Sequence, residues 1–303
     1  MSRSVFRNRR GFQDFNVSIE DGQRISEIID GIICIHYRQK NNVEVCNITT
    51  QEVARLPGIN CCCEDAFSKF YEPYYSLGFN PLTNQYIVLK FCSIKAHNCH
   101  GHTRKAALEC DIFTLGGLSN TWRKIDSPPP HCSIPQSGSI CVNGTIYWQS
   151  SGFPISLLAF QLKDEKFQII QAPQDASRIK MIKHPTGHLA LVGELHGQTK
   201  KLCMWKLMDH HRQIWAPREE MFVPLYFPCE RPVGTLGEGN VYLGHHSSPD
   251  FKLSAYHIDV NKKKIYEIDI PGQHPIIAAI SDIVRNHDDI VITNHTETLF
   301  AIR

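Results

Sequence analysis

The 303-residue chain lacks any long hydrophobic run and carries almost no net charge. No stretch approaches the roughly 18 apolar residues of a membrane-spanning helix, so we expect no transmembrane segment. The formal net charge is only +2, whereas a nucleic-acid-binding surface needs a clustered excess of basic residues. We therefore expect neither a membrane nor a nucleic acid as the partner.

An export signal is also missing. Four arginines stand within Met1–Arg10, but no apolar segment follows them, so the start of the chain is unlike a secretory signal. The twelve cysteines stand mostly singly within apolar runs. Without an export route such cysteines are expected to be reduced, buried thiols. We expect a cytoplasmic or nuclear protein.

Sequence patterns of common catalytic sites are absent as well. The chain contains no G-x-S-x-G, H-E-x-x-H or phosphate-binding glycine motif. Gly234–Gly239 is rich in glycine, but no Lys-Ser or Lys-Thr pair follows, so we interpret it as a turn. The neighbouring carboxylates Asp288 and Asp289 are expected in a loop. We predict that the protein is not an enzyme and needs no cofactor, and we assign no catalytic residue.

The largest concentration of possible metal ligands comprises Cys92, His97, Cys99, His100, His102 and Cys110. Thiolate and imidazole groups are suitable donors for zinc. The spacing nevertheless lacks the paired C-x2-C or H-x3-H arrangements that prepare a tetrahedral site. We predict a solvated loop and no metal site, with zinc binding as the alternative.

A run of three cysteines and two pairs of histidines are interpreted as structural and not as functional. Cys61-Cys62-Cys63 is followed by Glu64 and Asp65, and such carboxylates would raise a thiol pKa rather than activate the thiol. We therefore expect an unreactive loop there. The histidine pairs at 210–211 and 245–246 are interpreted as loop or rim residues.

Helical periodicity is scarce, and only Gln23–Ile29 and Glu64–Tyr71 are compatible with short helices. Short β-rich runs bounded by Gly, Pro, Asn and Asp dominate instead. One unit recurs, in which an apolar strand is followed by a polar turn and a second strand. The copies lie at Val43–Val53, Glu109–Ile125, Leu157–Ile170, Leu202–Trp215, Leu253–Tyr266 and, incompletely, Thr298–Ile302.

The copies align on a single apolar position in each, namely Val45, Ile112, Phe160, Trp205, Tyr256 and Phe300. The spacings are 67, 48, 45, 51 and 44 residues. The longest interval contains the polar segment Ser93–Lys105, which we expect to form a loop. A period of about 45–50 residues is typical of one four-stranded propeller blade.

Further hairpins between the copies would supply the inner strands of each blade. The strongest signal is Asn143-Gly144 between two apolar runs, because this dipeptide favours a two-residue hairpin turn. The expected inner strands are Gly31–His36, Tyr75–Phe79, Tyr86–Phe91, Ser139–Val142, Thr145–Trp148, Leu189–Val192 and Asn240–Leu243.

We predict an all-β fold, a single β-propeller domain spanning residues 1–303 with six blades. A seven-bladed ring is the second interpretation and a pair of β-sandwiches the third. We expect an N-terminal strand with Phe12, Phe15 and Val17 to close the ring, because an open ring would leave two sheet edges unpaired. The four tryptophans are expected to pack between blades, with a binding role at strand ends as the alternative; they are Trp122, Trp148, Trp205 and Trp215.

Several of these segments, taken together, resemble the F-box-associated β-propeller domains of plant F-box proteins, in particular the type 3 subfamily. They follow the family's order over roughly residues 30–215, at Val45–Pro57, Leu77–Leu89, Thr114–Ile125, Ile140–Trp148, Ala159–Phe167 and Leu202–Asp209. Ile48 replaces the family's usual proline, and Phe79-Asn80 replaces its Tyr-Asp. From Phe222 onward only the blade periodicity supports the propeller.

The resemblance implies a protein-interaction module that recognises the substrate of an SCF-type ubiquitin ligase, so its partner is a protein destined for ubiquitination. The helical F-box normally precedes the propeller. Residues 1–30 are too few to contain it, so we expect no direct contact with the Skp-type adaptor. The family binds through variable loops, and we assign no binding residue. The alternatives are a propeller enzyme that acts on a carbohydrate or small molecule through its central channel, and a truncated remnant without function.

Overall fold

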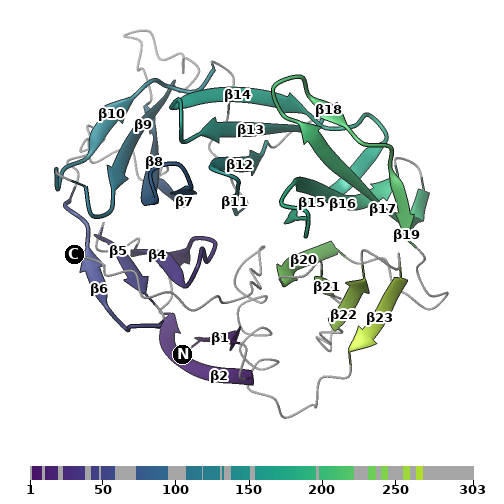
Figure 1. The fold of residues 1–303 in the computed structure, drawn as a ribbon, viewed down its shortest axis with the longest axis horizontal. Helices are drawn as coiled ribbons and strands as arrows, with labels where there is room; N and C mark the ends of the chain where they lie inside the picture. The colour runs from purple at the N-terminus through teal and green to yellow at the C-terminus, as the bar shows by residue number, and fades with distance from the viewer. Residues whose placement is uncertain are drawn as a thin grey trace, which may run out of the picture. The chain divides into compact units, whose positions relative to one another are not determined.

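The computed structural model describes residues 2–8, 11–19, 23–37, 42–47, 49–58, 73–94, 107–117, 119–129, 132, 138–150, 154–195, 198–221, 231–236, 240–244, 255–259 and 264–268. The regular structure within these ranges is all β-strand, labelled β1 to β23 in Figure 1. None of the described residues forms a helix that is long and apolar enough to cross a bilayer. The chain falls into two compact units. The N-terminal unit comprises Gly22–Ile170 and Thr296–Arg303, and the C-terminal unit comprises Met1–Asp21 and Gln171–His295.

The N-terminal unit contains three four-stranded antiparallel sheets, each made of strands that are consecutive in the chain. Sheet 1 has the order β3 (Gln23–Ile25), β4 (Ile32–Tyr37), β5 (Asn42–Asn47), β6 (Val53–Arg55). Sheet 2 has the order β7 (Tyr74–Asn80), β8 (Gln85–Ile94), β9 (Ala107–Thr114), β10 (Arg123–Ile125). Sheet 3 has the order β11 (Ile140–Val142), β12 (Thr145–Gln149), β13 (Ser156–Gln161), β14 (Lys166–Gln171).

The C-terminal unit contains a larger sheet and three hairpins. Sheet 4 has the order β15 (Ala176–Lys183), β16 (Leu189–Leu195), β17 (Gln198–Asp209), β18 (Ile214–Trp215), and β19 (Glu219–Met221) also pairs with β17. The hairpins are β1 (Ser2–Asn8) with β2 (Gly11–Ile19), β20 (Arg231–Leu236) with β21 (Asn240–Gly244), and β22 (Ala255–Asp259) with β23 (Lys264–Ile268). Strand β21 lies against β22.

The repeat found in the sequence is confirmed in sheets 1 to 4. The aligned positions fall on the third strand of each sheet, where all four are at most 2% exposed; they are Val45, Ile112, Phe160 and Trp205. Tyr256 lies on β22, and Phe300 lies outside the described residues.

Three expectations need comment. The helix expected at Gln23–Ile29 is wrong, because Gln23–Ile25 is strand β3 and Ile29 forms a bridge with Ile32. The buried strand β4 supplies backbone partners there, and tertiary pairing overrides weak local helix propensity. The helix expected at 64–71 lies outside the described residues. The loop expected at Ser93–Lys105 begins later, since β8 continues through Ile94 and residues 95–106 are not described.

The N-terminal strand that carries Phe12, Phe15 and Val17 is confirmed as β2, which pairs with β1. Closure of a ring by this strand stays a prediction, as does the count of six blades. The organisation of residues 1–303 as one domain is likewise a prediction.

The hairpin turn predicted at Asn143-Gly144 is confirmed. Both residues have a positive φ, 48° at Asn143 and 72° at Gly144, as the two-residue turn that matches the twist of paired strands requires. Ile140–Val142 pairs with Thr145–Tyr147 across it. The sequence therefore sets the register of this hairpin locally.

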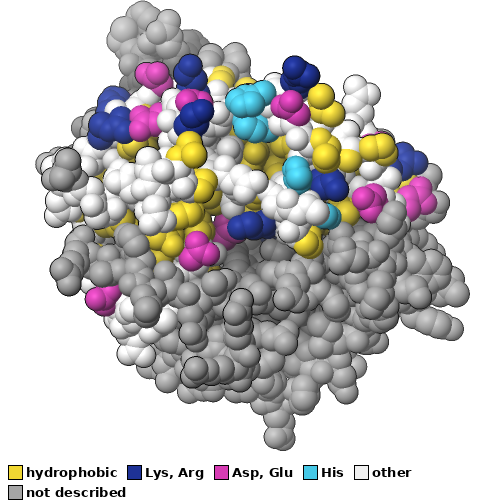
Figure 2. Space-filling model, viewed as in Figure 1, with side chains coloured by type: hydrophobic (Ala, Val, Ile, Leu, Met, Phe, Trp, Pro, Cys, Tyr) yellow, Lys and Arg dark blue, Asp and Glu magenta, His cyan; other side chains and the backbone are white. Residues whose placement is uncertain are grey.

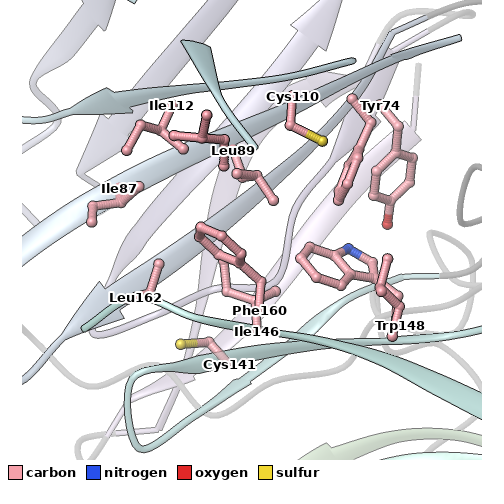
Figure 3. Packing of buried hydrophobic residues seen from close by; sticks show 13 residues of the cluster. Tyr74, Ile87, Leu89, Cys110, Ile112, Cys141, Ile146, Trp148, Phe160 and Leu162 are labelled. Carbon is pink, nitrogen blue, oxygen red and sulfur yellow. The ribbon is translucent and has the colours of Figure 1, made fainter. Parts of the chain in front are cut away.

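Sheet 2 is packed between sheets 1 and 3, and each of its faces has its own apolar core. Alternate residues of β8 point to opposite faces, so Tyr86 and Val88 join the residues of sheet 1 while Ile87, Leu89 and Phe91 join those of sheet 3. Figure 3 shows side chains of β8 and β9 facing those of β12 and β13. The core between sheets 2 and 3 includes Phe91, Cys110, Ile112, Ile146, Trp148 and Phe160.

One polar contact lies inside the core between sheets 2 and 3. The indole N–H of Trp148 donates to Ser76 Oγ at 2.8 Å, and neither residue is exposed to solvent. An indole nitrogen that is buried needs an acceptor. Ser76 therefore supplies the acceptor that the indole N–H of Trp148, the largest side chain of this core, needs.

We predict that Ser76→Ala destabilises the protein by about 1–3 kcal/mol, because it leaves the buried Trp148 N–H without an acceptor. Urea unfolding followed by tryptophan fluorescence would measure the change. The matched control is Ser119→Ala, since Ser119 is exposed and bonds only locally to Thr121. Equal unfolding midpoints for the two variants would contradict the assigned role of Ser76.

Gly193 of β16 lies close to the backbone of β15 in sheet 4. A Cβ atom at this position would lie 2.6 Å from the carbonyl oxygen of Ser177 and 3.0 Å from Ile179 Cα. Strand β15 has an irregular register between Ser177 and Lys180, so its backbone bends toward β16 here. Only glycine fits without moving one of the two strands.

We expect Gly193→Ala to destabilise the fold by about 1–3 kcal/mol, because the added methyl group meets backbone that cannot rotate away. Gly58→Ala is the control, since a Cβ at Gly58 meets nothing within 4 Å. That change should stay within about 0.5 kcal/mol. Chemical denaturation of both variants measures the free energy of unfolding. An unchanged value for Gly193→Ala would contradict the prediction and show that β15 can move away from the added methyl group.

Candidate functional site

The connections between strands leave sheets 1 to 3 at two opposite edges. Neighbouring antiparallel strands run in opposite directions, so the first-to-second and third-to-fourth connections share one edge, here called the turn edge. The second-to-third connections and the connections from one sheet to the next share the other, here called the loop edge. The two edges differ in the amount of chain that they carry.

The turn edge is made of short, hydrogen-bonded connections, of which the longest spans residues 115–122. The Asn80 side chain accepts the backbone N–H of Leu82 at 3.0 Å, and the N–H of Leu162 donates to the Gly144 carbonyl at 2.9 Å. In the turn between β5 and β6, the Asn47 side chain accepts the backbone N–H of Thr49 at 2.8 Å. Hydrogen bonds within and between the described turns thus hold this edge.

The loop edge carries the long connections, and they are concentrated around sheet 2. Residues 56–73 lead into β7, residues 95–106 join β8 to β9, and residues 126–139 lead out of β10. Long connections on a rigid scaffold are the usual location of recognition residues. The loop edge of sheet 2 is therefore the candidate functional site.

The short outer strand β10 fixes sheet 2 against both neighbouring sheets. The Trp122 indole N–H donates to the Pro57 carbonyl of sheet 1 at 2.7 Å, and Arg123 forms two hydrogen bonds with the Glu165 carboxylate of sheet 3, one of 2.9 Å. Lys124 pairs with Glu109 of its own sheet. Trp122 precedes β10 directly, and successive residues of an extended chain point to opposite faces, which explains how Trp122 and Arg123 reach different sheets.

The inner strands are also connected. Glu27, which follows β3, accepts the backbone N–H of Cys141 in β11 at 2.7 Å. This contact joins sheets 1 and 3 across a sequence separation of 114 residues. The inner parts of sheets 1 and 3 are therefore joined directly by this hydrogen bond.

A group of polar side chains lies on the face of sheet 2 that meets sheet 1, close to the loop edge. Lys90 of β8 stands opposite Tyr75 of β7 and Asp111 of β9 in the strand register. The ring of Tyr75 packs on His36 of sheet 1, with centroids 4.7 Å apart. Lys90 is only 2% exposed, and its Nζ lies 4.0 Å from Asp111 Oδ2. Sequence reasoning missed this group, although a lysine within the apolar run Tyr86–Phe91 was a visible signal.

The six candidate zinc ligands cannot form one site. Cys92 follows Lys90 on the face toward sheet 1, whereas Cys110 belongs to the core that faces sheet 3. Burial, with smaller contributions from Asp111 and Glu109, raises the pKa of Cys110, which disfavours the thiolate needed for zinc. The candidates at 97–102 lie outside the described residues, within which no metal-binding group of three ligands occurs.

The other residues singled out in the sequence lie in different surroundings. Trp148 and Trp205 are at most 2% exposed and pack in cores, whereas Trp122 and Trp215 are partly exposed. His210 and His211 lie in the turn between β17 and β18, as expected, with ring centroids 3.9 Å apart. Gly234–Leu236 belongs to β20 and so is strand, not turn. The candidates at 61–65, 245–246 and 288–289 lie outside the described residues.

Figure 2 shows acidic, basic and histidine side chains interspersed with apolar ones on the face in view. No patch of a single charge sign covers the described part of this face. The arrangement agrees with the balanced net charge of +2. Recognition here would depend on individual contacts and not on a broad field.

The connection between β15 and β16 contains a pair of histidines that the sequence analysis did not single out. The backbone N–H of Thr186 donates to His184 Nδ1 at 3.2 Å, and Thr186 Oγ1 lies within 3.0 Å of His188 Nδ1. An accepting Nδ1 implies a neutral His184 ring. Burial, and then the charge of Lys206, lowers the pKa of His184, whereas Glu219 acts in the opposite direction.

The sequence matches the F-box associated beta propeller domain over residues 4–296. Sheets of consecutive antiparallel strands, without a described helix, are the architecture of a β-propeller protein. The chain belongs to the F-box associated β-propeller domain family. The resemblance noted in the sequence and the all-β propeller class are thereby confirmed.

The curated relatives are F-box proteins of Arabidopsis thaliana. An F-box/kelch-repeat protein is 29% identical, with 78% of this chain covering 56% of the relative. A putative F-box protein is 22% identical, with 91% of this chain covering 68% of it. Another is 24% identical over 55% of this chain and 54% of the relative. The chain therefore spans little more than half of two of these relatives.

Solved structures show only distant likeness. A streptogramin B lyase has a TM-score of 0.44 at 13% identity, over 86% of this chain and 72% of that one. A chain of a nidogen/laminin complex has a TM-score of 0.45 at 10% identity, over 86% of this chain and 84% of that one. Likeness at this level carries no argument about function.

We predict that the free energy of unfolding falls as the pH is lowered from about 7.5 to about 5.5, in part through His184. Its folded pKa lies below the ordinary value of about 6.5, so the unfolded chain takes up the proton first and acid favours unfolding. The loss should be smaller in His184→Gln, which keeps an acceptor for Thr186. His211→Gln, in an exposed turn, is the control. Identical pH profiles for all three proteins would contradict this role of His184.

Proposed function

We propose that this chain is the target-recognition domain of an SCF-type ubiquitin ligase, which holds the protein to be ubiquitinated. Membership of the F-box associated family supports this, as do relatives that are themselves F-box proteins. In this proposal the chain binds, and other subunits of the ligase carry out the ubiquitin transfer. The target is a cytoplasmic or nuclear protein.

The observation that carries the proposal is the concentration of the long connections at residues 56–73, 95–106 and 126–139 around one firmly held sheet. Sheet 2 is joined to sheet 1 through Trp122 and to sheet 3 through Arg123. A rigid base reduces the entropy that recognition loops lose on binding. We therefore propose that the target binds at the loop edge of sheet 2.

Contact with the Skp-type adaptor belongs to a different part of such ligases. The chain covers 56% of the F-box/kelch-repeat relative. We propose that adaptor binding is a property of an F-box and not of the sheets described above. The recognition domain then contributes target choice alone.

The proposal predicts that the loop edge, and not the turn edge, determines what the protein captures. The tagged chain would be used to capture proteins from Arabidopsis seedling extract, beside a variant whose residues 95–106 are replaced by a Gly-Ser linker of equal length. The matched control changes Lys163 and Asp164, which are exposed at the turn edge, to serine. We expect the wild type and the control to capture the same protein and the linker variant to lose it at least about tenfold, roughly 1.4 kcal/mol.

The captured protein should also become ubiquitinated when the chain, fused behind an F-box, is combined with adaptor, cullin and ubiquitin-conjugating enzyme. Thermal unfolding of each variant shows whether its fold is intact. Equal capture by the linker variant would contradict the assignment of the loop edge. A captured protein that is never modified in the reconstituted ligase would contradict the function itself.

A further inference from the structure

The first strand of sheet 4 contains a β-bulge with an unusual residue in it. Two residues of β15, Arg178 and Ile179, stand opposite the single residue Gly193 of β16. The backbone of Arg178 has a φ of 46°. In a bulge with a positive φ the first of the two residues is usually glycine, because a Cβ atom would lie too close to the following carbonyl oxygen. Arg178 is therefore held in an unfavourable backbone conformation.

The neighbouring residues hold this bulge in place. Directly before it, the Ser177 hydroxyl donates to the Glu194 carbonyl at 3.2 Å. Opposite it, Gly193 lacks the Cβ atom that would lie 2.6 Å from the Ser177 carbonyl oxygen. Strained residues persist where the surrounding structure enforces them, and bulges redirect side chains beside functional sites. The local structure thus fixes the direction in which the Arg178 side chain leaves the strand.

The guanidinium group of Arg178 is accessible to a partner. The Arg178 side chain is 60% exposed, whereas the neighbouring Glu194 side chain is 9% exposed. Arg178 Nη1 lies 3.6 Å from Glu194 Oε2, which is beyond hydrogen-bond distance. Glu194 therefore attracts the guanidinium group without accepting a hydrogen bond from it. The five N–H donors of a guanidinium group form a rigid fork that matches the two oxygens of a carboxylate.

The hairpin around the bulge carries an excess of positive charge. Strand β15 contains Arg178, Lys180 and Lys183 and no acidic residue. In β16 the charged residue is Glu194 alone. Three positive charges and one negative charge leave the two strands at a formal charge of +2. Complementary charge steers partners toward each other, so a negatively charged group is the expected partner of this hairpin.

The bulge lies close to one edge of sheet 4. Ala176 pairs with Leu195 at this edge, and the next pair is Ser177 with Glu194. The connection from sheet 3 and the connection between β16 and β17 leave sheet 4 there. Connections of the same two kinds define the loop edge in sheets 1 to 3. Both strands of the hairpin and the connection 172–175 that precedes it belong to the described residues.

We propose that Arg178 binds the carboxylate of an aspartate or glutamate side chain of the target protein. This inference rests on the proposed function and adds a contact in sheet 4 to the long connections around sheet 2. The two oxygens of a carboxylate accept two parallel N–H groups of a guanidinium group, in charge-assisted hydrogen bonds. Glu194 is a positioning residue, because it attracts the guanidinium group from one side and leaves its donors to the target.

The position of Glu194 favours a carboxylate over a phosphate group. Because Glu194 lies beside the guanidinium group of Arg178, any anion that binds this group also comes close to the Glu194 carboxylate. The repulsion between them increases with the charge of the anion. A phosphorylated side chain carries a charge of about −1.5 to −2 at neutral pH, whereas a carboxylate carries a single negative charge. The expected ligand is therefore an ordinary acidic residue.

Titration of the whole chain with hexaglutamate tests the inference directly. The chain is labelled with 15N at arginine, and the Nε–H signal of Arg178 is identified by its loss in Arg178→Gln. We expect hexaglutamate to shift this signal in a saturable way and hexaglutamine to leave it in place. Inorganic phosphate at the same concentration should shift it less. An unchanged Arg178 signal, or an equal shift with phosphate, would overturn the assignment of a carboxylate ligand.

The affinity for hexaglutamate separates Arg178 from other exposed arginines. Arg212 is the matched control, because its side chain is 80% exposed and its Nε lies 3.9 Å from Asp209 Oδ2, but it lies in a turn and not in a bulge. We expect at least about tenfold weaker binding to Arg178→Gln, roughly 1.4 kcal/mol, and unchanged binding to Arg212→Gln. Equal affinities of the two variants would overturn the inference. Should Arg178→Gln unfold, the double variant with Glu194→Gln replaces it.

The stability of a glycine variant tests whether the bulge is maintained at a cost. In a Glu194→Gln background, which has no ion pair to lose, we expect Arg178→Gly to raise the urea midpoint of unfolding, because glycine adopts a positive φ without strain. Arg212→Gly in the same background should not raise it. A lower midpoint for Arg178→Gly would show that arginine is not strained at this position and would overturn the argument from the bulge.

The outcomes separate this inference from the proposed function. Equal capture of one target by the wild type and Arg178→Gln would overturn the role of Arg178 and leave target recognition intact. If the wild type captured no target, the proposed function would fail, while the hexaglutamate titration would still decide whether Arg178 binds carboxylates.

Discussion

A sheet with two apolar faces needs a neighbouring sheet on each face, and sheet 2 is such a sheet. Sheet 2 shows the consequence most clearly, because alternate residues of β8 enter two separate cores. A side chain on either face has to fit a neighbour from a distant part of the sequence. The packing of sheet against sheet is therefore the constraint on which the rest of the N-terminal unit depends.

The segment Trp122–Ile125 contributes to this packing of sheet against sheet. Trp122 bonds to sheet 1, Arg123 bonds to sheet 3, Lys124 pairs within sheet 2, and Ile125 is buried in the core toward sheet 3. One strand of three residues, with the tryptophan before it, thus contributes contacts to all three sheets.

The loop edge has a different character, because there β8 and β9 continue past β7 and β10 as a two-stranded ribbon. Lys90 is buried close to this edge, beside a carboxylate that is too distant for a hydrogen bond. The other face of sheet 2 contains the satisfied polar contact between Trp148 and Ser76.

The strands, the turn at Asn143-Gly144 and the blade repeat were predictable from the sequence, because alternation and turn chemistry act between residues close in the chain. The family could be recognised for the same reason, since its motifs are strands and turns in a fixed order. The error at Gln23–Ile29 arose where the pairing partner β4 outweighed local propensity. A single zinc site made of all six candidate ligands is excluded because the strand register places Cys92 and Cys110 on opposite faces.

What the sequence by itself determined was therefore the set of strands and the class of fold. Only the tertiary structure decided that Lys90 is buried, that Trp148 finds Ser76, and that the histidines at 184 and 188 share one hydroxyl group. Burial of Lys90 and Trp148 depends on sheets that meet across long sequence separations, and no local pattern records those meetings. The candidate site belongs to this second group, because only the pairing of β7, β8, β9 and β10 brings the ends of the long connections to one edge.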